Sequence, residues 1–224
     1  MSNGVVYLIA IVAFGGSYVV KWWLKSTYRK WSQVPNQYGI TGAQAAAAIL
    51  ADNGITSVQI LPVAGSLTDH YDPQKDILRL SETNYGTTSV AAMAVSAHEA
   101  GHALQDFGED RRLKLRRFLV PAAALGARFG PLVALAGLML NSGFILRLGV
   151  FLLAGMMLFQ LATLPVEFNA SRRALRNLER LGLSDPEQRT GVRRVLTAAA
   201  FTYVAAAATA VAYLLFLIGR SRGA

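Results

Sequence analysis

The chain has 224 residues and no cysteine; 53% of the residues are hydrophobic, 16% are charged, and the formal net charge at pH 7 is +9. These proportions are typical of membrane proteins, and without cysteine the chain forms neither disulfides nor a thiolate zinc site. The excess positive charge suits basic segments beside an anionic bilayer, so it does not indicate nucleic-acid binding.

The first apolar stretch, Val5–Leu24, is long enough to cross a bilayer. It has no charged residue before Lys21 and closes on Lys21, Trp22 and Trp23, which is typical of a headgroup boundary. No basic segment precedes it, and the bulky residues at its end do not resemble a signal-peptide cleavage site. We predict an uncleaved transmembrane anchor over residues 1–24.

Residues 25–117 are predicted to form a small α+β domain outside the bilayer. A helix capped by Thr41 and ended by Asn53 comes first. Two strands, Val58–Val63 and Asp76–Leu80, follow and are predicted to form a hairpin around a turn-rich loop. The second of these strands could present a free edge to an extended substrate.

A further helix is predicted to begin after Thr88 or Ser89 and to end near Phe107. It carries the pentapeptide His98-Glu99-Ala100-Gly101-His102. Residues four apart share one face of a helix, so the two imidazoles can bind one metal ion while the adjacent carboxylate reaches a water. This HExxH pattern is typical of zinc hydrolases.

The rest of the chain contains three more apolar stretches of membrane-spanning length. Two of them form a helical hairpin over 118–166, and the third is a C-terminal transmembrane helix with its tail over 196–224. Between them, 167–195 is predicted to be a basic cytoplasmic helix. The stretches are Phe118–Leu140, Phe144–Val166 and Leu196–Ile218.

Positive charge sets the predicted orientation. Of the 22 Lys and Arg residues, 18 lie in the two segments that flank the hairpin, counted as Lys21–Arg117 and 166–195. The positive-inside rule therefore puts both segments in the cytoplasm and both termini outside. We predict a multi-pass protein of the cell membrane, mainly α-helical with about four transmembrane helices, and an active site at the cytoplasmic face.

A catalytic zinc site usually has three protein ligands, so a third donor is needed. The hairpin leaves the cytoplasmic face after the motif helix and returns to it at Glu167, which can bring this carboxylate toward His98 and His102. The alternative is an interfacial acid that pairs with Arg172 or Arg173.

Four stretches of the chain resemble the YugP-like family, described as membrane-bound neutral zinc metallopeptidases. They are Leu67-Thr68-Asp69-His70-Tyr71-Asp72-Pro73, Leu80-Ser81-Glu82, the segment from Ala97 to Gln105, and the segment from Leu164 to Leu175. The resemblance implies a gluzincin-type peptidase with a zincin-like domain. It implies one zinc ion per chain on His98, His102 and Glu167, with Glu99 as the catalytic residue.

Two positions depart from the expected pattern. The family usually has Asp where this chain has Asn169, and gluzincins often have Asp where it has Ser171. A neutral side chain cannot supply the same electrostatic support to a zinc histidine. We therefore assign no orienting partner to the histidines from sequence.

We interpret the chain as a membrane-bound zinc endopeptidase in which zinc and Glu99 activate a water. His70 is a predicted second catalytic residue because it lies on the polar loop and could steady an oxyanion, as could Tyr71; His70 could instead be structural. The expected substrates are membrane-proximal or unfolded segments of proteins, chiefly of membrane proteins.

Two other classes stay open: a zinc-binding scaffold or assembly factor without proteolytic activity, and a zinc hydrolase of nonpeptide acyl bonds. Nitrogen and oxygen ligands also suit cobalt or nickel, with zinc favoured by availability. The expected partners are the lipid bilayer and a protein substrate, with a homo-oligomer or another membrane protein left open.

Overall fold

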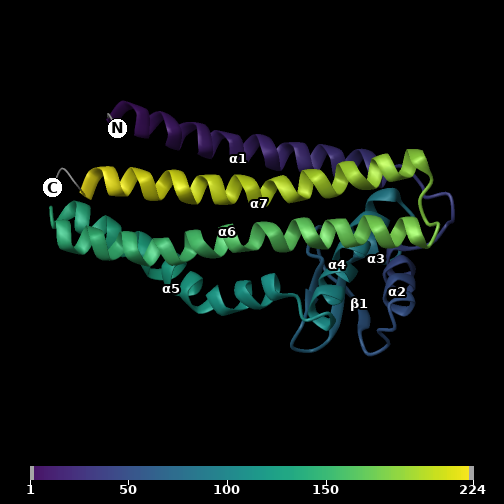
Figure 1. Ribbon diagram of the computed structural model, residues 1–224. Helices are drawn as coiled ribbons and strands as arrows, with labels where there is room; N and C mark the ends of the chain where they lie inside the picture. The colour runs from purple at the N-terminus through teal and green to yellow at the C-terminus, as the bar shows by residue number, and fades with distance from the viewer. Residues whose placement is uncertain (1–2, 222–224) are drawn as a thin grey trace. The chain divides into compact units, whose positions relative to one another are not determined.

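A computed structural model describes residues 3–221 and is mainly helical with one small sheet (Figure 1). The elements, in chain order, are α1 (Asn3–Ser32), α2 (Gly42–Asp52), β1 (Gln59–Val63), β2 (His70–Asp72), β3 (Ile77–Ser81), α3 (Glu82–Tyr85), α4 (Val90–Phe107), α5 (Arg111–Met139), α6 (Gly143–Arg180) and α7 (Pro186–Ser221). The predicted mainly α architecture is confirmed.

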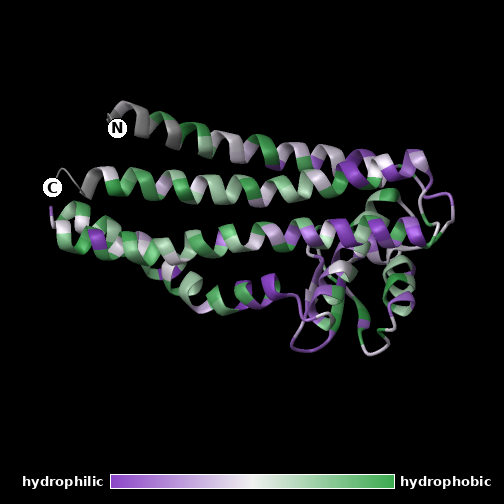
Figure 2. Ribbon diagram, in the orientation of Figure 1, coloured by the Kyte–Doolittle hydropathy of each residue, from purple (hydrophilic) through white to green (hydrophobic). Residues whose placement is uncertain are grey.

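Within the described residues, three helices are long and apolar enough to cross a membrane: α5, α6 and the 186–219 part of α7. They cover the third and fourth predicted spans completely and the second up to Met139, one residue before its predicted end. The first predicted span, Val5–Leu24, lies within α1, which is not among the three. Four crossings therefore stay a prediction. Figure 2 shows α6 changing from mostly apolar to more polar residues toward its Arg180 end.

The chain divides into two compact units, which we describe separately. The first contains Met1–Lys21, Arg111–Val166 and Phe201–Ala224. Its α5 and α6 approach so closely that a Cβ at Gly137 would collide with the backbone of Leu146. Small residues at such contacts are typical of helices that pack against one another in membranes.

The second unit contains Trp22–Asp110 and Glu167–Ala200. Its three-stranded sheet has the order β1-β3-β2, with β1 parallel and β2 antiparallel to β3. The predicted hairpin is wrong: the short strand β2, which we did not predict, reverses the chain between the two predicted strands and makes them parallel. β3 is consequently the central strand, paired on both sides, so the predicted free edge is wrong as well.

The two helices predicted within residues 25–117 form with the expected caps. The Thr41 hydroxyl accepts from the Gln44 N–H at 3.2 Å, and the Gln44 side chain accepts in return from the Thr41 N–H at 2.8 Å. This capping box satisfies two N–H groups that the first turn of α2 would otherwise leave unpaired. Ser89 caps α4 by accepting from the Ala92 N–H, and Gly108 ends the helix.

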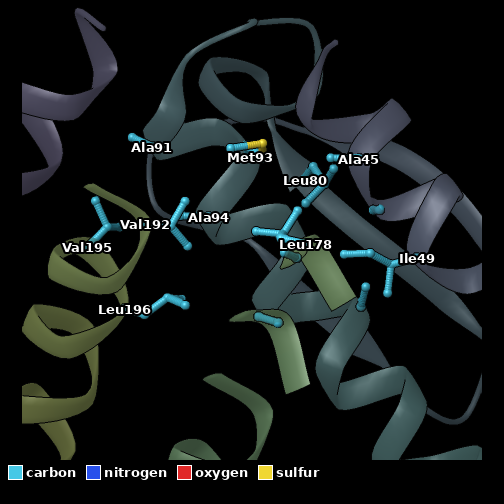
Figure 3. Close-up of a cluster of buried hydrophobic side chains, with 14 of the residues drawn as sticks. Ala45, Ile49, Leu80, Ala91, Met93, Ala94, Leu178, Val192, Val195 and Leu196 are labelled. Atoms are coloured by element: carbon cyan, nitrogen blue, oxygen red, sulfur yellow. The ribbon is translucent and has the colours of Figure 1, made fainter. Parts of the chain in front are cut away.

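One buried cluster holds this unit together (Figure 3). Ile49 of α2, Leu80 of β3 and Met93 of α4 are fully buried in it beside Leu178 of α6 and Val192 of α7. The cluster thus fixes α4 against the C-terminal part of α6. These two helices carry the candidate site.

The predicted single basic helix over 167–195 consists of two helical segments. α6 ends at Arg180, Gly182 has a positive φ of 66°, and α7 begins at Pro186. Glycine reaches this backbone conformation without a steric penalty, and proline favours the first position of a helix. The chain therefore turns back between the two segments.

Candidate metal centre

The motif helix α4 brings its histidines beside α6 through a close backbone contact. A Cβ at Gly101 would lie 2.6 Å from the carbonyl oxygen of Ala170. Real Cβ contacts are not that short, so only glycine permits this separation of the two helices at this point. On α4, Gly101 lies between the two histidines in sequence. On α6, Ala170 comes three residues after Glu167.

The ligand atoms of His98, His102 and Glu167 lie within 4.8 Å of one another, and they form the group suited to a metal ion within the described residues. Glu167 Oε2 lies 3.2 Å from His98 Nε2 and 3.5 Å from His102 Nε2. Zinc bonds of roughly 2.0–2.1 Å in a tetrahedral site separate neighbouring ligand atoms by about 3.3 Å. Nitrogen, nitrogen and oxygen donors at these separations fit a zinc ion.

Glu167 is buried, with its side chain only 3% exposed, and its ion pairs are with the two histidines. Arg173, which we considered as an alternative partner, instead lies 3.7 Å from Asp110. The predicted approach of Glu167 to the histidines is confirmed as a matter of proximity. Its role as a ligand stays a prediction.

Glu99 is buried on α4, the helix of the two histidines. This burial raises the pKa of the Glu99 carboxyl, although the nearby imidazoles of His98 and His102 act in the opposite direction. Burial works against protonation of His102, but the hydrogen bond and negative charge of Glu167 outweigh it and hold the pKa of the imidazole above its usual value. The centre thus combines a poorly solvated carboxyl with histidines close to an anion.

The outward-facing nitrogen of each histidine has a polar neighbour. Ser171 Oγ lies 3.2 Å from His98 Nδ1, and Gln105 Oε1 lies 2.9 Å from His102 Nδ1. Sequence reasoning missed Gln105, although a position three residues after His102 on one helix was a usable signal. Gln105 in turn contacts Asn169, one of the positions where this chain departs from the family pattern.

The polar loop residues have other contacts. His70 is exposed at the start of β2, its Nδ1 lies 2.8 Å from the Thr68 carbonyl oxygen, and it is not part of the His, His, Glu group. The Tyr71 hydroxyl contacts the carboxylates of Asp76 and Asp106, and burial together with these acids raises the pKa of Tyr71. A catalytic role for His70 stays a prediction.

Two histidines and a glutamate that converge from neighbouring helices, next to a buried second carboxyl, define a candidate mononuclear zinc enzyme. A family model described as "Putative neutral zinc metallopeptidase" matches residues 6–222. The chain belongs to this family.

The chain is also similar to the protein named "Putative membrane protease YugP" of Bacillus subtilis (strain 168). The two are 42% identical over 217 residues, which cover 95% of this chain and 96% of the relative. The predicted family resemblance is therefore confirmed over nearly the whole length. No solved structure matches the chain significantly.

Proposed function

We propose that this protein is a membrane-bound zinc endopeptidase that cleaves membrane-proximal or unfolded protein segments. The observation that carries the proposal is the meeting of His98, His102 and Glu167 beside the buried carboxyl of Glu99. Membership of a family of zinc metallopeptidases and similarity to a protein named as a membrane protease support it.

In this proposal, His98 and His102 bind zinc through Nε2 and Glu167 binds it through a carboxylate oxygen. The bound metal supplies Lewis acidity, which polarises a substrate carbonyl and makes water more acidic. Glu99 accepts a proton from the attacking water on its carboxylate and delivers it to the leaving amine nitrogen. His70 is proposed to approach the substrate as a second catalytic group from the edge strand β2.

The proposed location of the active site is the cytoplasmic face of the cell membrane. Residues 25–117 and 167–195 form the proposed cytoplasmic parts, and 1–24, 118–166 and 196–224 the membrane parts. Support comes from the three membrane-length helices and from the placement of most Lys and Arg in the first two segments. At that place the available peptide bonds are those of cytoplasmic loops and of unfolded tails.

Metal analysis of the full chain in detergent tests the ligand set. We expect about one zinc ion per wild-type chain, and a large loss of zinc in His98→Ala and in Glu167→Ala. Zinc binding by Glu167→Ala as tight as that of the wild type would show that the third ligand is wrong.

A Glu99→Gln variant tests the chemistry. We expect it to keep zinc and to lose about 10²- to 10⁴-fold in the rate of cleavage of an unfolded protein, because the amide cannot accept the proton. A zinc-loaded wild type that cleaves neither peptide nor ester substrates would favour a scaffold, and one that cleaves only esters would favour a different hydrolase.

A further inference from the structure

A chain of side-chain hydrogen bonds runs from Arg173 on α6 to His102 on α4. Arg173 Nε donates to Asn169 Oδ1 at 2.9 Å, and Gln105 Nε2 donates to the same oxygen at 3.0 Å. Gln105 Oε1 then lies 2.9 Å from His102 Nδ1. All four residues belong to the same compact unit.

The donor and the acceptor in each of these hydrogen bonds follow from Arg173, where the series begins. A guanidinium has no acceptor, so the atom of Asn169 that faces Arg173 must be the carbonyl oxygen. Because Gln105 contacts that same oxygen, it must present its amide N–H₂ to Asn169 and hence its oxygen to His102. The order of the two amide groups is thereby determined by chemistry.

The last bond has a consequence for His102. Gln105 Oε1 can only accept, so Nδ1 of His102 carries the hydrogen, and in the neutral ring Nε2 keeps its lone pair. Nε2 is the atom that lies 3.5 Å from Glu167 in the candidate centre. This series of hydrogen bonds therefore selects the tautomer in which His102 can bind a metal through Nε2, the nitrogen that faces Glu167.

Burial keeps water from replacing these contacts. Gln105 is completely buried, and Asn169 is half-buried between Gln105 and the guanidinium. The far end is held in place because Arg173 Nη2 also lies 3.7 Å from the carboxylate of Asp110, whose side chain is 7% exposed. A buried amide with its oxygen toward a histidine keeps that orientation when its N–H₂ is also paired.

We propose that Arg173, through Asn169 and Gln105, acts as a positioning residue that orients His102 for metal binding. The inference rests on the proposed function only in taking His102 as a zinc ligand. The role falls on three residues that lie outside the His98, His102 and Glu167 group.

Zinc affinity of the full chain in detergent, measured by competition with a chromogenic chelator, tests the proposal. Gln105→Leu removes the acceptor at His102 Nδ1, and we expect a zinc Kd about 10- to 100-fold higher. Arg173→Met frees the two amides to flip, and we expect a smaller increase of about 3- to 10-fold, below that range. Arg172→Met, an exposed neighbour that loses the same charge, should leave the Kd unchanged.

The double variant Gln105→Leu/Arg173→Met separates positioning from a general structural effect. If Arg173 acts through Gln105, the double variant binds zinc no more weakly than Gln105→Leu alone. Thermal unfolding of the metal-free proteins identifies any variant that has simply lost its fold.

Equal penalties for Arg173→Met in the wild-type and Gln105→Leu backgrounds would overturn the proposal. So would an unchanged Kd in Gln105→Leu or in Arg173→Met. In all these cases the wild type still binds zinc, so the proposed function stands. A wild type that binds no zinc would overturn the proposed function and the positioning role together.

Discussion

Ser171 stands where the resemblance led us to look for an Asp, and it still reaches His98. Its hydroxyl lies 3.2 Å from Nδ1, so it can fix the ring's orientation as a neutral acceptor but cannot stabilise positive charge on it as a carboxylate would. In this chain both histidines therefore rest on neutral side chains, Ser171 and Gln105.

We expect Ser171→Ala to weaken zinc binding by about 2- to 10-fold, because one neutral hydrogen bond contributes about 0.5–1.5 kcal/mol. The chelator competition described above measures the change. A loss above 100-fold would mean that Ser171 does more than orient His98, and an unchanged Kd would mean that the contact does not support the ring.

Asp69 organises the loop before β2 around buried partners. Its carboxylate accepts from the Ser81 N–H at 2.8 Å, from the Ser81 hydroxyl and from Asn84 Nδ2 at 2.9 Å. Ser81 and Asn84 are fully buried. The Asp of the family-like stretch at 67–73 thus joins β2, β3 and α3.

Asp69→Ala should lower the free energy of unfolding by about 1–3 kcal/mol for each buried donor left without an acceptor. Thermal unfolding in detergent measures it. Asp72→Ala is the matched control, since the Asp72 carboxylate accepts from the exposed Gln74 N–H, and it should change stability little. Equal effects of the two substitutions would contradict this account.

At the scale of elements, α2 and α4 were predictable because their signals are local. Caps at Thr41 and Ser89 and the end at Gly108 can be recognised from a few neighbouring residues. β2 has only three residues, too short for a period-2 pattern, so its pairing with β3 was missed. Without β2, the parallel pairing of β1 with β3 was not predictable.

In the candidate metal centre too, some features could be predicted from the sequence and others depend on contacts between distant residues. The approach of Glu167 to the histidines followed from the topology of the hairpin, which is a coarse property of the sequence. The Gln105 to Asn169 contact joins residues 64 positions apart through side-chain geometry, and no local pattern encodes it. Gly101 was visible in the motif, but its reason, the carbonyl of Ala170, was not.

The α4 and α6 contact gives a direct prediction. Gly101→Ala places a methyl group against the Ala170 carbonyl oxygen, so the helices must separate, at a cost of about 1–3 kcal/mol in stability and with weaker zinc binding. Gly86→Ala is the matched control, because a Cβ there meets nothing within 4 Å. Wild-type zinc affinity in Gly101→Ala would show that the close contact is not needed.

At the scale of the whole molecule, a chain without native cysteine allows its topology to be mapped one position at a time. With a membrane-impermeant maleimide on intact cells, we expect Gly4→Cys and Asn141→Cys to react, and Glu187→Cys to react only after permeabilisation. Protection of Gly4→Cys beside a reactive Asn141→Cys would mean that α1 does not cross. Reaction of Glu187→Cys in intact cells would overturn the proposed cytoplasmic location of the site.

The second compact unit is discontinuous in sequence: its proposed ligands come from residues before 110 and after 166, with the hairpin synthesised between them. During translation, His98 and His102 are made well before Glu167 exists. The three-ligand centre therefore cannot assemble until the intervening helices have been made. For the same reason, a soluble fragment with all three proposed ligands cannot be obtained by trimming the ends of the chain alone; it would need a linker in place of residues 111–166.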